Sequence, residues 1–217
     1  MSADKKLLIV GAGGFGREVL AWARAHPDCG ARWTISGFLD DNPSALDGYG
    51  YATSITGTIR DHKPARDELF VCAIGTPSIK RNVCESLRER GAEFIRLVHP
   101  SVILGAHVSL GEGVVLCPRV TLTADIEVGD FVCINCHSSA GHDTHIGAWS
   151  TISGHCDLTG GARIGREVLL GSGARILPGK SVGDGALVGA GSVVLRSVKP
   201  EQKVFGNPAR AFEQPQK

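Results

Sequence analysis

The feature of this sequence that most restricts its fold is a six-residue repeat in the second half of the chain. Every sixth residue from Leu104 to Val194 is aliphatic. A second series of mostly small or β-branched residues lies two positions before each of them, and glycine often follows. This period predicts strands and turns, and three such hexads would form the three flat faces of one coil. We therefore predict a parallel β-helix in which residues 18 apart stack on neighbouring coils, whereas an all-β sandwich would alternate with period two.

The residues before the repeat have a different pattern. They alternate between expected strands and helices, which is typical of a small parallel α/β sheet. The expected strands lie at 6–10, 35–39, 69–74 and 94–98, and the expected helices at 16–25 and 78–91. Since the repeat begins after Pro100 and ends at Val194, we expect three parts. These are a Rossmann-like α/β domain at 1–98, a β-helix at 99–196 and a C-terminal tail at 197–217.

Charge and cysteine content restrict the partners. With 23 basic and 22 acidic residues the net charge is +1, so no field of one sign exists to recruit nucleic acid or a membrane. We therefore expect small-molecule partners. The apolar run at 7–10 is too short for a signal peptide or a membrane span, which favours the cytoplasm. Seven scattered cysteines favour free thiols, and no second pair completes a zinc site with Cys133 and Cys136.

A glycine-rich loop follows the first expected strand. Gly11, Gly13 and Gly16 satisfy G-x-G-x-x-G where that strand passes into a helix, so a phosphate could sit on the N–H groups at the helix N-terminus. Asp40 and Asp41 follow the second strand, where a carboxylate can meet a ribose or a base. Only about one hundred residues precede the repeat, too few for a dinucleotide dehydrogenase. A nucleotide that carries a sugar fits this space better, and a glycine turn without a ligand is the alternative.

His142 is the histidine best placed for catalysis. It lies two residues after Ala140 of the aliphatic series, so we expect it at a corner of the coil with its side chain outward. Asp143 can orient the imidazole or raise its basicity. Gly160, 18 residues on, is expected at the same corner of the next coil, where its N–H could stabilise the oxyanion formed when a thioester is attacked. A merely exposed histidine is the alternative.

A zinc enzyme of the γ-carbonic anhydrase class is a rival from a different functional class. Such enzymes use a β-helix and place three histidines around zinc at a trimer interface. His137 and His142 are five residues apart, and His107 lies upstream. The α/β domain would have no role in hydrating carbon dioxide, so we favour an enzyme that needs no metal.

Motifs along nearly the full length carry a resemblance to a known family. They are Gly11 to Gly16, Leu39-Asp40-Asp41, Ala73-Ile74-Gly75, Val98-His99-Pro100-Ser101, Gly141-His142-Asp143 with Ile146-Gly147, and Phe205 to Arg210. In this order they resemble the bacterial sugar acetyltransferases of the hexapeptide superfamily. This is the sialic acid O-acetyltransferase type, which includes the bacillosamine and perosamine N-acetyltransferases.

The resemblance implies a fold, an assembly and a reaction. The β-helix would be left-handed, and a homotrimer would hold acetyl-CoA between adjacent β-helices. The α/β domain would hold a nucleotide-linked amino sugar, whose amine would take the acetyl group directly. O-acetylation of sialic acid or another sugar hydroxyl is the alternative reaction.

The resemblance also implies roles for individual residues. His142 would be the general base, Asp143 its acidic neighbour, and Gly160 the amide that binds the thioester carbonyl. The remaining active-site residue would be Asn135. The sugar nucleotide would contact Gly11, Gly13, Gly14, Phe15, Asp40, Asp41 and Gly75. Acetyl-CoA would contact Gly160, Gly161, Gly171, Ser172, Gly189, Asn207, Pro208 and Arg210.

Two positions depart from the family pattern. The glycine loop of many members has histidine where this chain has Phe15, and some members have a second histidine where this chain has Thr151. Both departures concern which substrate is bound, not which reaction occurs.

Overall fold

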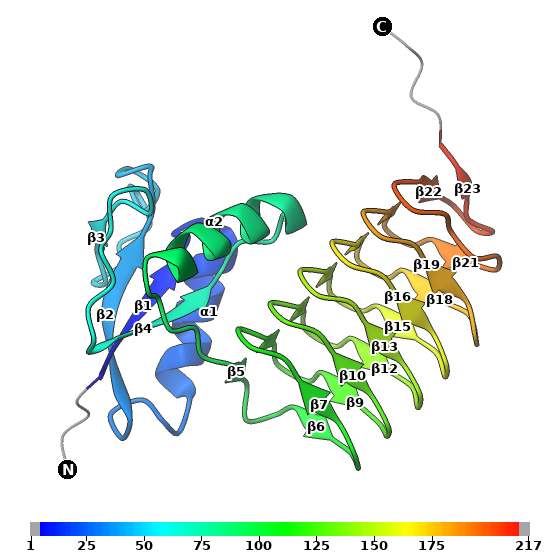
Figure 1. Ribbon diagram of the computed structural model, residues 1–217, viewed down its shortest axis with the longest axis horizontal. Helices are drawn as coiled ribbons and strands as arrows, with labels where there is room; N and C mark the ends of the chain where they lie inside the picture. The colour runs from blue at the N-terminus through cyan, green and yellow to red at the C-terminus, as the bar shows by residue number, and fades with distance from the viewer. Residues whose placement is uncertain (1–4, 213–217) are drawn as a thin grey trace, which may run out of the picture. The chain divides into compact units, whose positions relative to one another are not determined.

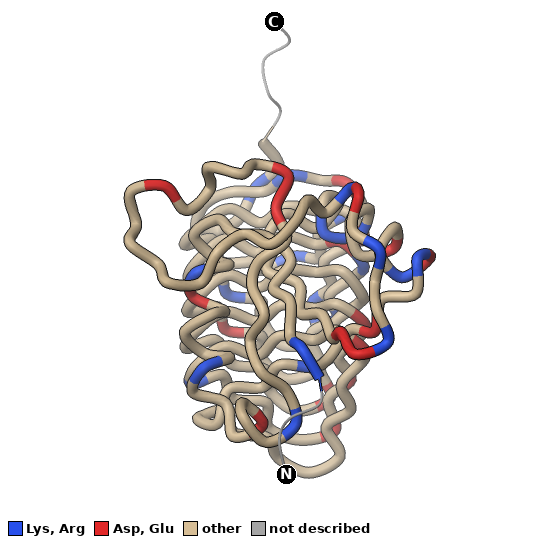
Figure 2. Tube along the Cα trace, turned by 90° about the vertical axis from the view of Figure 1, so that its left-hand side faces the viewer, with Lys and Arg blue, Asp and Glu red and all other residues tan. Residues whose placement is uncertain are grey.

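The protein is described by a computed structural model that covers residues 5–212. The chain divides after Pro100 into two compact units, an α/β unit and a β-helix (Figure 1). Each unit has its own hydrophobic core. Lys and Arg are interspersed with Asp and Glu along the trace (Figure 2), in line with the small net charge.

The α/β unit is a four-stranded parallel sheet with strand order β3-β2-β1-β4. Apolar residues fill the two central strands because both faces of a parallel sheet are covered. Its elements are β1 (Lys5–Val10), α1 (Gly14–Ala25), β2 (Trp33–Leu39), β3 (Ile55–Gly57), β4 (Glu68–Cys72), α2 (Pro77–Glu89) and β5 (Leu97–Val98).

Two details of this unit differ from the sequence-based prediction. Strand β3 was not predicted, since its three residues are too few to show a period. The strand predicted at 94–98 is shorter: Phe94 makes only an isolated bridge to Phe70, and the strand itself is β5. The other predicted elements are present with ends shifted by a few residues.

The β-helix has three faces of two-residue strands, each paired in parallel with the strand 18 residues away. We name each face by its first strand. The β6 face contains β6 (Ile103–Leu104), β9 (Thr121–Leu122), β12 (Ser139–Ala140), β15 (Asp157–Leu158), β18 (Arg175–Ile176) and β21 (Val193–Val194). The β7 face contains β7 (Ser109–Leu110), β10 (Glu127–Val128), β13 (His145–Ile146), β16 (Arg163–Ile164) and β19 (Ser181–Val182). The β8 face contains β8 (Val115–Leu116), β11 (Cys133–Ile134), β14 (Thr151–Ile152), β17 (Leu169–Leu170), β20 (Leu187–Val188), β22 (Lys203–Phe205) and β23 (Arg210–Ala211).

The aliphatic series predicted to point inward forms the core of the β-helix. From Leu116 to Val194 its members are no more than 2% exposed. Leu104, on the first coil, is 44% exposed because within this unit no earlier coil covers it. The core therefore depends on each coil being covered by the next.

The corners between faces explain how the chain turns so regularly. One residue in each hexad from His107 to Gly191 has a positive φ between 54° and 72°. Nine of these positions hold residues other than glycine, including Asp143 and Trp149. This left-handed conformation reverses the chain direction at one fixed point of every hexad.

The predicted tail extends the β-helix instead of leaving it. Strand β22 pairs in parallel with β20, and β23 folds back antiparallel on β22. Residues 213–217 of the tail lie outside the described residues. All seven cysteines are free thiols, and burial raises the pKa of Cys156 to about 11. Neither of the two helices described within residues 5–212 is long and apolar enough to cross a membrane.

Candidate active site

The carboxyl ends of three strands bring the predicted sugar-nucleotide residues of the α/β unit together. Val10, Leu39 and Cys72 are register partners at the ends of β1, β2 and β4. The glycine loop, Asp40 and the segment leading to Gly75 therefore start from one edge of the sheet. Open α/β sheets bind ligands at this edge.

The glycines of the loop serve two purposes. Gly11 has φ +99°, and a Cβ there would lie 3.1 Å from the Ala73 carbonyl oxygen. A Cβ on Gly16 would collide with the Gly11 carbonyl, so this glycine lets α1 pack against β1. By contrast, a Cβ on Gly13 would meet nothing within 4 Å. The loop is thus open to a ligand at Gly13 and Gly14, where α1 begins without a side-chain cap.

The two aspartates differ in how they are held. Asp40 accepts hydrogen bonds from the N–H of Ala12 at 2.7 Å and of Asn42 at 2.8 Å. Its carboxylate therefore links the end of β2 to the glycine loop. Asp41 accepts one bond, from the N–H of Arg60 at 3.1 Å, and is exposed.

The structure adds two residues to this edge that the sequence analysis missed. The Arg17 guanidinium lies 3.7 Å from the centre of the Tyr49 ring, and it is the side chain nearest to a Cβ built on Gly14. The sequence signal is an arginine in the first turn of the helix after the glycine loop. Phe15, predicted to contact substrate, is half-buried with its ring edge-on to Trp22.

A second helix begins at the same edge. Gly75 precedes Thr76, the N-cap of α2, which forms no side-chain cap. A Cβ on Gly75 would meet nothing within 4 Å, so the backbone is accessible there. Both helix N-termini therefore present N–H groups to this edge of the sheet, where the helix dipole favours an anion.

His142 lies where the sequence predicted, at the corner between the β6 and β7 faces. Asp143 next to it has φ 60°, which turns its carboxylate back onto the imidazole. Nδ1 of His142 and Oδ2 of Asp143 are 2.7 Å apart. Both side chains are about 70% exposed, at 71% and 69%. This contact leaves Nε2 as the ring nitrogen available to a substrate.

Gly160 lies on the next coil directly beside the imidazole. A Cβ built on it would be 2.5 Å from Nε2 of His142, so any larger residue would displace the ring. The backbone registers the two coils, because Gly161 N–H donates to the His142 carbonyl at 2.7 Å. No hydrogen bond from the Gly160 N–H is found within residues 5–212. A basic nitrogen and an outward N–H are therefore neighbours.

The predicted acetyl-CoA residues lie at two corners of the chain. Gly160 and Gly161 follow β15 at the same corner as His142. The others gather at the corner between the β8 and β6 faces: Gly171 and Gly189 follow β17 and β20, and the Phe205 ring packs on Gly189. Ser172 and the turn with Asn207, Pro208 and Arg210 lie at this second corner.

Asn135 belongs to the second corner as well. It follows β11 and accepts a hydrogen bond from the Cys117 thiol at 3.4 Å. The β6 face, here β12, separates it from His142. The predicted catalytic residues of one chain thus form two groups at opposite edges of this face.

The histidines considered for zinc are also dispersed. His137 stacks on His155, with ring centres 4.8 Å apart, at the same corner as Asn135. His107 pairs with Asp125 at 2.8 Å, and His142 pairs with Asp143. Within residues 5–212 no group of three or more His, Cys, Asp or Glu side chains is arranged to hold a metal ion.

Comparisons with known proteins agree with this two-part architecture. Residues 6–87 match the PglD N-terminal domain, and residues 161–196 match the hexapeptide repeat of succinyl-transferase. UDP-N-acetylbacillosamine N-acetyltransferase of Bacillus subtilis (strain 168) is 30% identical over 116 residues, which are 52% of this chain and 51% of that protein. The chain thus spans about half the length of the curated relatives it matches.

Solved structures align over the whole chain. PerB from Caulobacter crescentus in complex with CoA and GDP-perosamine is 29% identical, with a TM-score of 0.85 over 98% of this chain and 100% of that one. The acetyltransferase domain of PglB from Neisseria gonorrhoeae FA1090 in complex with acetyl coenzyme A is also 29% identical, with a TM-score of 0.85 over 97% and 100%. The predicted resemblance is thus confirmed, and the chain belongs to the left-handed β-helix proteins that join hexapeptide repeats to a PglD N-terminal domain.

Proposed function

We propose that this protein is an N-acetyltransferase that moves the acetyl group of acetyl-CoA to the amine of a nucleotide-linked sugar. The observation that carries the proposal is the His142 corner. There a carboxylate-bound imidazole leaves Nε2 beside the outward N–H of Gly160. The complexes of the relatives with CoA, acetyl coenzyme A and GDP-perosamine support this choice of ligands.

Each group has one task in the reaction. Asp143 accepts the Nδ1 proton of His142, which leaves the Nε2 lone pair free. The sugar amine attacks the thioester carbonyl, and Nε2 takes the proton that the nitrogen loses. The Gly160 N–H donates to the oxyanion, which then collapses and expels the CoA thiolate. An amide is formed, a thioester is broken, and no acyl-enzyme is required.

The edge of the α/β sheet is suited to the nucleotide. The uncapped N-terminus of α1 and the accessible N–H groups near Gly13 favour a diphosphate. Asp40, fixed by two backbone N–H groups, holds the loop in the shape that receives it. Asp41 and the Arg17 and Tyr49 pair flank the loop and are available for ribose or base.

The division of the site over two corners supports a homotrimer. His142 and Gly160 lie at one edge of the β6 face, and Asn135, Gly171 and Gly189 lie at the other. A CoA molecule that contacts both groups needs the first edge of one copy and the second edge of another. Sedimentation equilibrium should give a trimer at micromolar concentration, and a monomer would contradict this assembly.

The reaction is tested by a screen of acceptors. UDP-, GDP- and dTDP-linked 4-amino-4,6-dideoxy sugars and free sialic acid are each mixed with acetyl-CoA, and released thiol and acetylated product are measured. We expect transfer to the amine of at least one nucleotide sugar. Transfer to sialic acid alone would replace N-acetylation by O-acetylation, and release of thiol with no acceptor would contradict the proposal.

A further inference from the structure

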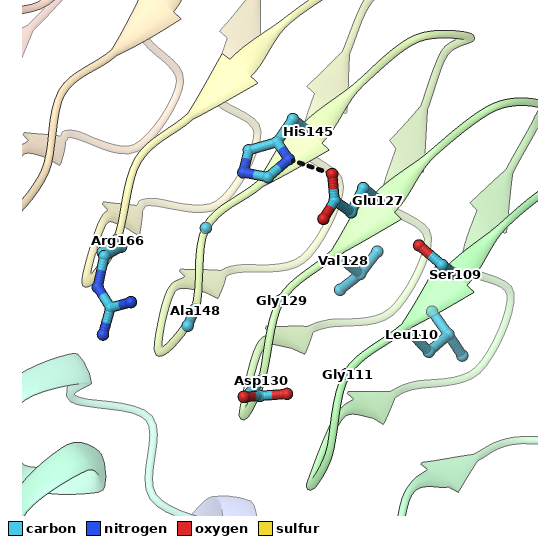
Figure 3. A pocket seen from close by; sticks show the side chains of 11 residues that line it. Ser109, Leu110, Gly111, Glu127, Val128, Gly129, Asp130, His145, Ala148 and Arg166 are labelled. Atoms are coloured by element: carbon cyan, nitrogen blue, oxygen red, sulfur yellow. Dashed lines mark hydrogen bonds and ion pairs between the residues drawn. The ribbon is translucent and has the colours of Figure 1, made fainter.

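The β7 face has a pocket that none of the predicted catalytic residues line. Its volume is about 470 Å³, within the range of small-molecule sites (Figure 3). Ser109, Glu127 and His145 stand on one side, as the outward residues of three successive strands in register. Asp130 and Arg166 stand on the other side, at the corner towards the β8 face.

The polar side of the pocket contains a second carboxylate and imidazole pair. Oε2 of Glu127 and Nδ1 of His145 are 3.1 Å apart, and Figure 3 shows the two side chains directed at each other. This contact orients the His145 ring and leaves its Nε2 unoccupied by Glu127. The pair is one coil-to-coil step long, so it exists because residues 18 apart stack.

The floor of the pocket is bare backbone. Gly111, Gly129 and Gly147 follow the three strands, and a Cβ on Gly129 would be 2.7 Å from the Ala148 nitrogen. Only glycine therefore fits, and the floor has no side chains. Asp130 is fixed at its edge, because its Oδ1 accepts the Glu112 N–H at 2.8 Å.

This combination matches the chemistry of a sugar ring. Hydroxyl groups both donate and accept hydrogen bonds, and the pocket offers acceptors on Glu127 and Asp130 and a donor on Arg166. A flat floor accommodates the C–H face of a pyranose. No aromatic side chain lines the pocket to stack on a base, and two carboxylates would repel a diphosphate.

The pocket is also within reach of the reacting nitrogen. His145 is three residues after His142, and three residues of extended chain span at most roughly 10 Å. We propose that the pocket binds the pyranose of the acceptor through its hydroxyl groups, and so selects the sugar. This assignment rests on the proposed function and adds to it a specificity site on the β7 face.

The test separates recognition of the sugar from recognition of the nucleotide. Calorimetry measures the affinity of the trimer for UDP, GDP and their 4-amino-4,6-dideoxy sugar conjugates. In Glu127→Gln, the gain in affinity that the sugar adds should fall about tenfold, and the affinity for UDP or GDP alone should be unchanged. Asp130→Asn retains Oδ1 and should act in the same direction. Arg163→Gln is the control, because Arg163 is the next outward residue after His145 and does not line the pocket.

Each other outcome has a definite meaning. An unchanged sugar contribution in both variants overturns the assignment, as does an equal loss for UDP alone. A change of sedimentation coefficient would make this face a contact between copies and would also overturn it. If the wild type binds and acetylates no sugar nucleotide, the proposed function fails first. If it does both while the variants match Arg163→Gln, only the pocket assignment fails.

Discussion

The two units of the molecule position their chemistry by different means. In the β-helix, one operation, the step of 18 residues, places His142 beside Gly160 and Glu127 beside His145. In the α/β unit, segments of unrelated length meet at the edge of a sheet, as when Asp40 binds Ala12 across 28 residues. The first unit is therefore sensitive to changes at single corners and the second to changes in the contacts between elements.

The largest effect should follow from removing the base at the corner. His142→Ala should lower kcat about a hundredfold to ten-thousandfold, because general-base catalysis contributes that much. Neither KM should rise comparably, since the imidazole acts mainly in the transition state. Steady-state kinetics on a correctly assembled trimer measures this. Near-normal turnover would mean that another residue is the base.

The dependence of each coil on its neighbours gives the next effect. Leu158→Ala in β15 should lower the free energy of unfolding by about 2–5 kcal/mol, because Leu158 is 1% exposed and a cavity would remain. Leu104→Ala is the matched control, since Leu104 lies on the first coil at 44% exposure. Urea denaturation measures both. Equal losses would contradict the idea that coverage by the next coil stabilises the core.

The contact between adjacent coils at the active corner is tested by adding one methyl group. Gly160→Ala should lower kcat about a hundredfold, because its Cβ would displace the His142 ring. Gly154→Ala is the matched control, at the same position of the preceding hexad, where a Cβ would meet only the Cys136 carbonyl oxygen at 3.3 Å. If both variants lose the same activity, the effect is a general one on the β-helix.

The α/β unit should respond through stability and nucleotide affinity together. Asp40→Ala removes the acceptor for two backbone N–H groups and should cost about 1–3 kcal/mol of unfolding free energy. The KM for the sugar nucleotide should rise, and that for acetyl-CoA should not. Asp41→Ala, which removes one exposed contact, should change stability less. An equal rise in both KM values would contradict the assignment of this edge to the nucleotide.

The smallest effect concerns a buried hydroxyl inside the β-helix. The Thr144 hydroxyl is buried and has no hydrogen-bond partner within residues 5–212. Thr144→Val should therefore be neutral or stabilise by up to about 1 kcal/mol. Ser150→Ala should destabilise, because Ser150 Oγ donates to Gly165 at 2.8 Å and accepts from Val168 at 2.9 Å. Thermal unfolding of the pair shows whether the difference has this sign.

The sequence by itself determined most of the β-helix and its catalytic corner. A period of six predicts which residues point inward, and a coil of three hexads predicts that Gly160 lies beside His142. Such predictions succeed because every contact in this unit has the same sequence separation. A residue's neighbours can then be found by counting.

Only the tertiary structure decided the rest. It separated Asn135 from His142, joined Arg17 to Tyr49, revealed β3 and placed Glu127 and Asp130 around one pocket. In the α/β unit the loops that set the spacing between elements have no period, so the sequence predicts the strands but not which side chains meet. In the β-helix the sequence predicts the stacking of side chains, but which outward residues enclose a pocket depends on side-chain conformations that a repeat does not specify.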